Sequence, residues 1–140
     1  MLHLTKLAVG VRDIEHLRAL QTDRARVNPP LRHRTRNSPR RRADVLDGGC
    51  MYWVINGTML VRQRILDIIE DQRDDQTRCT GLVLAPDLVP LAGRPTRPFQ
   101  GWRYLDPDDA PPDLPDVAGA IGVEVLPASL RRELLALCLL

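Results

Sequence analysis

The alternation of apolar and polar positions predicts a β-hairpin within residues 48–69, around which we expect the sheet to be built. Two β-prone runs flank Asn56-Gly57, the dipeptide that most readily supplies the two positive φ angles of a type I′ turn. Large apolar side chains occupy both faces near the turn, which favours a central hairpin that is buried on both sides. A two-residue turn would pair Ile55 with Thr58, Val54 with Met59, Trp53 with Leu60, Tyr52 with Val61 and Met51 with Arg62.

Beyond this hairpin, the second strand outruns the first and carries two arginines. Strict alternation places Arg62 and Arg64 on the face that holds Trp53 and Leu60. Either these arginines mark the edge of the sheet, with their heads in water, or a β-bulge turns them to the other face. Asp67 is the carboxylate that we expect on a rigid strand inside the domain.

The remaining elements follow from local signals along the chain. Residues 2–9 predict a strand, and Asp13 stands at the N-cap of a helix over residues 13–26, which Asn28-Pro29-Pro30 ends. Further along we expect a short strand at 31–35, a helical turn at 43–49, an exposed loop at 70–78, a strand at 81–85, a turn or single helical turn at 87–93, strands at 102–105 and 120–126, and a closing helix from Pro127 or Ser129.

This order of elements predicts the fold class. We expect a single α+β domain over residues 1–140, with a curved, mostly antiparallel sheet or a partly closed β-barrel and a helix towards each end. A chain of this length buries enough surface to be stable without disulfides or metals. The three cysteines are odd in number and lack metal spacing, and no signal peptide or membrane-length apolar run is present. These features indicate a cytoplasmic protein with no membrane partner.

Charge is distributed unevenly along the chain. Residues 1–42 contain eleven Lys and Arg against three Asp and Glu, whereas residues 43–118 contain seven against thirteen. Six arginines fall within residues 31–42, a density that requires neutralisation by anions. The partner is either external, such as the phosphates of a nucleic acid, or internal, namely the five aspartates of residues 106–116.

Aromatic residues are interleaved with arginines in residues 94–105. This stretch contains Phe99, Trp102 and Tyr104 together with three arginines. Aromatic planes beside guanidinium groups are the surfaces on which unstacked bases lie. The same residues would also serve to pin a loop to the core.

Catalytic signatures are not found in the sequence. Neither Ser38 nor Ser129 lies in a strained turn between glycines, and no phosphate-cradling glycine loop occurs. The histidines and cysteines have no metal-ligand spacing, so we expect no metal and no cofactor.

Three hypotheses of function follow. The first is a non-enzymatic RNA-binding domain, with the arginines of residues 32–42 on phosphates and Arg62 and Arg64 flanking a groove in which Trp102 or Tyr104 stacks a base. The second is a small enzyme for an anionic substrate, with Arg34, Arg36 and Arg64 as a clamp and His33 or Asp67 as acid or base. The third is a protein-interaction module with an internally neutralised basic segment. The candidate binding residues are Arg32, His33, Arg34, Arg36, Arg40, Arg41, Arg62, Arg64, Arg97, Trp102, Arg103 and Tyr104.

Four segments together resemble a known family. They are residues 33–37, 48–55, 61–66 and 97–105. The chain resembles a family of small bacterial proteins catalogued as domain of unknown function 1489, and this resemblance implies no activity, cofactor or catalytic residue. The order of a helix, an arginine-bearing segment, a glycine turn and a hairpin is also similar to PUA-like domains, including their ASCH and EVE relatives. That likeness implies a small curved barrel and RNA or a modified base as ligand.

Overall fold

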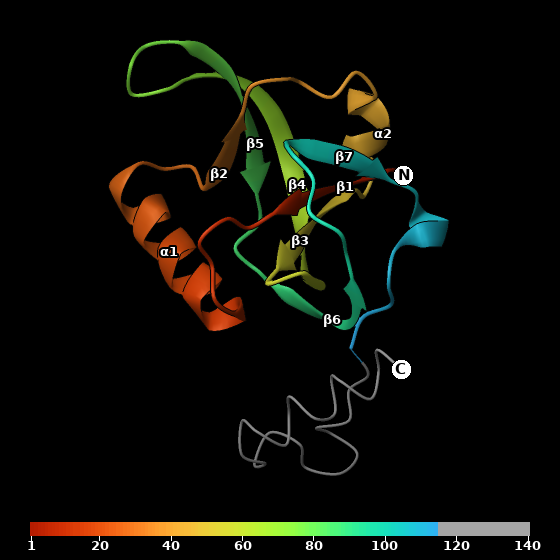
Figure 1. The fold of residues 1–140 in the computed structure, drawn as a ribbon. Helices are drawn as coiled ribbons and strands as arrows, with labels where there is room; N and C mark the ends of the chain where they lie inside the picture. The colour runs from red at the N-terminus through yellow and green to blue at the C-terminus, as the bar shows by residue number, and fades with distance from the viewer. Residues whose placement is uncertain (115–140) are drawn as a thin grey trace.

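The computed structural model of the protein describes residues 1–114, which form a sheet flanked by two helices (Figure 1). The predicted strand at 120–126 and the predicted closing helix lie outside the described residues. In chain order the elements are β1 (His3–Leu7), α1 (Ile14–Val27), β2 (Arg32–Thr35), α2 (Arg42–Leu46), β3 (Cys50–Ile55), β4 (Thr58–Gln72), β5 (Arg78–Leu84), β6 (Val89–Pro95), β7 (Trp102–Leu105) and a 3₁₀ turn at Pro107–Asp109.

Seven strands make one open, mixed sheet. Their order is β2-β5-β4-β3-β1-β7, and β6 pairs with the first half of β4. The β1–β3 pair is parallel and the other pairs are antiparallel. The α+β class and the mostly antiparallel sheet are therefore confirmed. Strand pairing does not close a barrel within residues 1–114, because β2 and β7 are the two ends of the path.

Helix α1 begins where the sequence predicts. The Asp13 side chain accepts a hydrogen bond from the backbone N–H of His16 at 2.7 Å, which satisfies one of the unpaired donors of the first turn. Leu17 and Gln21 are buried against the sheet. The helix ends at Val27, just before the Asn28-Pro29-Pro30 run, because proline cannot continue it.

The β3–β4 hairpin turns at Asn56 and Gly57, whose φ angles are 49° and 79°. The two predicted pairs next to the turn, Ile55 with Thr58 and Val54 with Met59, are confirmed. The next three predicted pairs are wrong, because the register shifts by one residue between Trp53 and Val54. Beyond the shift, the strands pair Trp53 with Val61, Tyr52 with Arg62 and Met51 with Gln63.

This β-bulge decides which side chains of β4 enter the core. It turns Arg62 to the face opposite Trp53 and places Gln63 beside Trp53 instead. The structure therefore has the β-bulge that the sequence offered as one of two explanations for Arg62 and Arg64.

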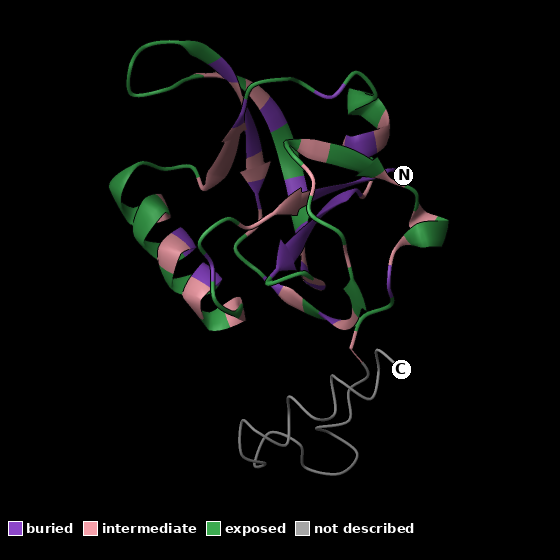
Figure 2. Ribbon diagram, viewed as in Figure 1, coloured by how far each residue is buried: buried purple, intermediate pink, exposed green. Residues whose placement is uncertain are grey.

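Strand β3 is buried at every position, as Figure 2 shows by its purple colour. One face of β3 carries Met51, Trp53 and Ile55, which pack in the core cluster that also holds Leu17 of α1. The other face carries Cys50, Tyr52 and Val54, which pack with Met59 and Leu91, among others. The prediction of a central hairpin buried on both sides is thus confirmed.

A buried polar network fastens α1 to this hairpin. The Gln63 Oε1 atom accepts hydrogen bonds from Trp53 Nε1 at 3.0 Å and from Gln21 Nε2 at 2.9 Å. Its Nε2 atom donates to Gln21 Oε1 and to the backbone carbonyl of Ala85, both at 2.7 Å. Each polar atom of the buried Gln63 amide is therefore satisfied, as a core of low dielectric requires.

Two expectations about loops are corrected. Residues 89–93 of the predicted turn at 87–93 belong to strand β6, and Pro90 and Pro95 occur where β6 pairs with β4, at the rim of the sheet. Strand β4 also runs on to Gln72 and β5 begins at Arg78, so the predicted loop at 70–78 is shorter than expected.

The expectation that Asp67 lies inside the domain is also corrected. Asp67 is exposed, and its Oδ1 atom accepts a hydrogen bond from the Ile68 N–H.

Candidate nucleic-acid interface

Arg32 and Arg34 of β2 are neutralised from within the fold. Both donate from Nε to Asp71 Oδ2 of β4, Arg34 at 3.3 Å, and Arg34 Nη1 lies 3.3 Å from Asp74 Oδ1. The side chains of Arg32 and Asp71 are only 10% and 11% exposed. The hydrogen bond from Arg32 is the main cause that lowers the pKa of Asp71 to about 2. These two arginines are therefore bound to the protein's own carboxylates.

The internal partner of the basic segment is different from the one we considered. Among residues 1–114, the ion pairs of residues 32–42 go to Asp71, Asp74 and Asp44, and none goes to residues 106–114. The end of the acidic segment instead contacts the β4–β6 pair: Leu114 N donates to Pro90 O of β6, and Asp113 binds Arg62 of β4.

The remaining arginines of the segment lie beyond the end of β2. Arg36, Arg40, Arg41 and Arg42 are all exposed. Arg41 Nε lies 3.0 Å from Asp44 Oδ2, and Arg42 Nη2 donates to the backbone carbonyl of Ile68. No ion pair to Arg36, Arg40 or Arg42 occurs in the part of the chain that the structure describes. Three cationic heads are thus available to an external anion.

Strand β7 fixes two aromatic rings beside these arginines. Trp102 and Tyr104 lie edge to face, with ring centroids 5.0 Å apart and an interplanar angle of 72°. Trp102 Nε1 donates to the Asn37 carbonyl at 3.0 Å, and the Tyr104 hydroxyl accepts from the Arg41 N–H at 3.1 Å. These bonds join segments more than 60 residues apart in the sequence and hold the aromatic pair against the arginine segment.

Two joined hollows surround this junction. The first has a volume of about 830 Å³ and is lined by Arg36, Ser38 and Arg40 from the basic segment and by Gln100, Trp102 and Tyr104 from around β7. The second, of about 740 Å³, is lined by Arg36, Ser38, Arg42, Arg78, Glu70 and Thr80, among others. Because Arg36 and Ser38 line both, the two hollows adjoin at these residues. We call them together the arginine trough.

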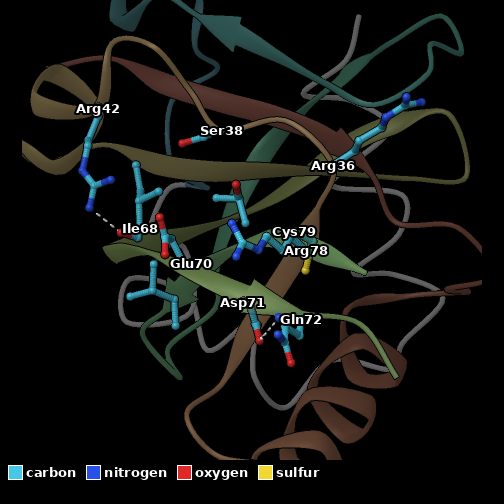
Figure 3. Close-up of a pocket in the computed structure, with 11 residues that line it drawn as sticks. Arg36, Ser38, Arg42, Ile68, Glu70, Asp71, Gln72, Arg78 and Cys79 are labelled. Carbon is cyan, nitrogen blue, oxygen red and sulfur yellow. Dashed lines mark hydrogen bonds between the residues drawn. The ribbon is translucent and has the colours of Figure 1, made fainter. Parts of the chain in front are cut away.

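Four arginines surround the trough. Figure 3 shows Arg36, Arg42 and Arg78 around the second hollow, with the Arg42 guanidinium turned towards the main chain of Ile68. Glu70 and Asp71 also line this hollow, and Asp71 is already bound to Arg32 and Arg34. The arginines therefore outnumber the unpaired carboxylates in the trough, which makes it suited to a polyanion.

Four of the twelve predicted binding residues line the trough. They are Arg36, Arg40, Trp102 and Tyr104. The other eight lie outside its lining, and their surroundings differ. His33 packs edge to face on Trp53. Aspartates pair with Arg32, Arg34, Arg41 and Arg62, the last through Asp113. Arg103 lies 4.8 Å above the Phe99 ring, and Arg64 and Arg97 are exposed outside the trough.

Arg62 does not flank the aromatic pair, contrary to our first hypothesis. Its guanidinium makes a bidentate contact with Asp113, with Nε and Nη2 at 2.7 and 2.8 Å from the two carboxylate oxygens. This contact is the main cause that raises the pKa of Arg62 and lowers the pKa of Asp113. The reason for the error is the bulge, which turns Arg62 towards the Cys50 side of β3, where its Nη1 lies 3.6 Å from Cys50 Sγ.

The arginine clamp of the enzyme hypothesis is not assembled either. Arg34 is bound to Asp71 and Asp74, Arg36 lines the trough, and Arg64 lies outside it. Asp67 is exposed and lines neither hollow of the trough.

Sequence reasoning missed Arg78 and Gln100 as residues of the site. Arg78 enters the trough because β5 pairs with β4 in a register that sets Arg78 opposite Gln72. Gln100 enters because it precedes the β7 strand that pairs with β1. Nothing in the local sequence signals either position, since both depend on long-range strand pairing.

The fold and the trough define a small α+β domain with a basic, aromatic-edged surface hollow. The family model described as a protein of unknown function, DUF1489, matches residues 4–140, and the chain belongs to that family. Searches of curated proteins and of solved structures find no match to this chain.

Neither a membrane-spanning helix nor a metal-binding cluster is found within residues 1–114. Within residues 1–114, no helix has the length and apolar character needed to cross a membrane. The same residues contain no group of three or more His, Cys, Asp or Glu side chains placed to hold a metal ion.

Proposed function

We propose that the protein binds single-stranded nucleic acid, and RNA in particular, in the arginine trough. The observation that carries this proposal is the meeting of Arg36 and Arg40 with Trp102 and Tyr104 around one hollow. Guanidinium groups bind phosphates through paired N–H donors, and exposed aromatic rings accept unstacked bases. A single strand offers both at once, whereas a duplex keeps its bases stacked.

Each part of the trough has its own role in this proposal. Arg36, Arg40, Arg42 and Arg78 bind successive phosphates along the two joined hollows. Tyr104, which is 40% exposed, stacks a base, and Trp102 supports it from the side. Ser38 lies where the hollows join and offers a hydroxyl to a phosphate or sugar.

Substituting three trough arginines tests the electrostatic part. The triple variant Arg36→Ala, Arg40→Ala, Arg42→Ala is expected to bind mixed-sequence RNA about 100-fold more weakly at low salt, because three phosphate contacts are lost. The wild-type protein should show a log–log salt slope of about −3, and the variant a slope of about −1. Fluorescence anisotropy with a labelled oligonucleotide between about 50 and 200 mM salt measures both.

A matched control removes the same charge elsewhere. The triple variant Arg64→Ala, Arg97→Ala, Arg103→Ala leaves the trough intact and should keep the wild-type slope. No binding by the folded wild-type protein, or an equal loss in both triple variants, would contradict the proposal.

The aromatic part is tested at Tyr104. The Tyr104→Ala variant should lose roughly tenfold in affinity for single-stranded RNA, since one stacked base contributes about 1–3 kcal/mol. Tyr104→Phe keeps the ring and removes only the hydroxyl that accepts from Arg41 N–H, so its affinity should stay within about threefold of wild type. Equal losses in the two variants would show that the ring face is not used.

We also propose that the fold is PUA-like. This proposal is supported by the order of its elements: α1, the arginine-bearing β2, the Gly48-Gly49 turn and the β3–β4 hairpin.

We further propose a cytoplasmic location. Cys50 and Cys79 are free thiols, which supports a reducing compartment.

A further inference from the structure

The two hollows of the arginine trough offer different groups to a ligand. The first hollow contains the two aromatic rings of Trp102 and Tyr104. The second has no aromatic residue in the lining that residues 1–114 provide, and its arginines are accompanied by the hydroxyl-bearing Ser38 and Thr80. The first hollow is therefore suited to a base, and the second to a phosphate group.

Strand pairing places the two hollows next to each other on the sheet. Thr35 of β2 lines the first hollow, and Thr80 of β5 lines the second. These two threonines are register partners in the β2–β5 ladder, so the hollows meet at neighbouring positions of one rigid sheet. Because the sheet fixes both hollows, a ligand that spans them has its base and its phosphate at defined places.

The sheet also positions donor groups in the second hollow. Arg78 and Thr80 are two residues apart on β5, so their side chains project from the same face of the strand. Arg42 reaches the hollow from α2, and a hydrogen bond from its Nη2 atom to the Ile68 carbonyl holds the guanidinium there (Figure 3). Donors that are held before the ligand arrives lose less conformational freedom on binding.

The second hollow carries more positive charge than one internal phosphate would neutralise. Among residues 1–114, its lining has three arginines and two carboxylates, and the carboxylate of Asp71 already pairs with two arginines of β2. Three guanidinium charges are therefore set against the single carboxylate of Glu70. An internal phosphate carries one negative charge, whereas a terminal phosphate monoester carries about −1.5 to −2 at pH 7. The charge of the hollow thus fits the terminal group better.

We propose that the trough binds the phosphorylated end of a single strand rather than its interior. The end base stacks on Tyr104 in the first hollow, and the terminal phosphate accepts hydrogen bonds from Arg42, Arg78 and Thr80 in the second. Arg40, in the first hollow, binds the phosphate that links the end nucleotide to the next one. This inference rests on the proposed nucleic-acid binding and specifies which part of the strand is bound.

Anisotropy measurements on strands that differ only at their ends test the inference. Three strands share one mixed sequence of about ten nucleotides and carry a 5′-phosphate, a 3′-phosphate or hydroxyl groups at both ends. One of the two phosphorylated strands should bind at least about tenfold more tightly than the hydroxyl-ended strand at the same salt concentration. Which of them does so identifies the end that the trough accepts.

A charge control and two variants separate the terminal phosphate from general effects. The methyl ester of the preferred terminal phosphate has one negative charge and should lose most of the gain in affinity. Arg78→Ala should remove most of the preference for the phosphorylated strand. Arg73→Ala removes an exposed arginine of the turn between β4 and β5, outside the trough lining, and should keep the wild-type preference.

The outcomes distinguish this inference from the proposed function. Equal affinities for the hydroxyl-ended strand and both phosphorylated strands would overturn the inference and leave the nucleic-acid proposal standing. No binding of any strand by the folded wild-type protein would overturn both. A methyl ester that binds as tightly as the free terminal phosphate would also overturn the inference, and this result on the wild-type protein does not depend on whether Arg78→Ala folds.

Discussion

Replacing Gly49 with alanine is expected to destabilise the fold by about 4 kcal/mol or more. A Cβ atom at this position would lie 2.2 Å from the carbonyl oxygen of Leu2 and 2.2 Å from that of Val45. Both atoms are main chain, so neither can move aside as a flexible side chain would. Urea unfolding, or the loss of a cooperative transition, measures the effect.

Gly49→Ala is expected to destabilise the fold this strongly because three elements converge at Gly49. Its N–H donates to Val45 O at 2.9 Å at the end of α2, and its own carbonyl accepts from Ile65 N at 3.1 Å. The start of β1 approaches from the other side through Leu2. Relieving the clash would separate α2 and β1 from the central hairpin.

Gly57→Ala is the matched control. Gly57 has a φ of +79°, and a Cβ there would meet no atom within 4 Å, so alanine adds only backbone strain of about 1 kcal/mol. If Gly49→Ala unfolded at the same urea concentration as Gly57→Ala, the close main-chain packing described for Gly49 would be wrong.

The stability of the protein is expected to fall by about 3 kcal/mol between pH 6.5 and pH 4 because of His33. The pKa of His33 is about 4 in the folded protein, against an ordinary value of 6.5. Above pH 6.5 the ring is neutral in both states and has no effect. Below that pH the unfolded chain binds a proton that the folded protein does not, so the free energy of unfolding falls as the pH falls.

Urea unfolding of wild type and His33→Phe at several pH values tests this prediction. The phenyl ring keeps the contact with Trp53 but cannot titrate, so the difference between the two proteins isolates His33. His3, whose pKa is lowered by burial and by Arg62, contributes with the same sign in both proteins and cancels. An unchanged pH dependence in His33→Phe would contradict the assigned burial.

Asp71 acts in a separate pH window. Its folded pKa of about 2 lies below its ordinary value of 3.8, so its ion pairs with Arg32 and Arg34 stabilise the fold above pH 3.8. That contribution is lost only as the pH falls from 3.8 towards 2. The loss assigned to His33 is nearly complete before Asp71 begins to titrate.

Much of the secondary structure could be predicted because its signals are local. The Asp13 cap, the proline stop after α1 and the Asn56-Gly57 turn act over a few residues, and each occurs where expected. Strand β6 was missed because its two prolines signal a turn, and only pairing at the rim of the sheet makes them compatible with a strand.

The candidate site was only half predictable. Local composition marked the arginines of residues 32–42 and the aromatics of residues 99–104 as separate features. Which arginines remain available depends on partners distant in the sequence: Asp71 binds Arg32 and Arg34, and Asp113 binds Arg62. Such pairings depend on strand register, which one bulged residue changes for every side chain beyond it.

The amino-acid sequence alone therefore specified the helix, the central hairpin, the α+β class and the two kinds of side chain that the trough uses. Tertiary structure decided that Arg36 and Arg40 meet Trp102 and Tyr104, because β7 pairs with β1 and its two rings bond to the main chain at Asn37 and Arg41. It also decided that His33 packs edge to face on Trp53 rather than lining the arginine trough. Contacts between segments far apart in sequence leave no local pattern, since they arise only when the sheet assembles.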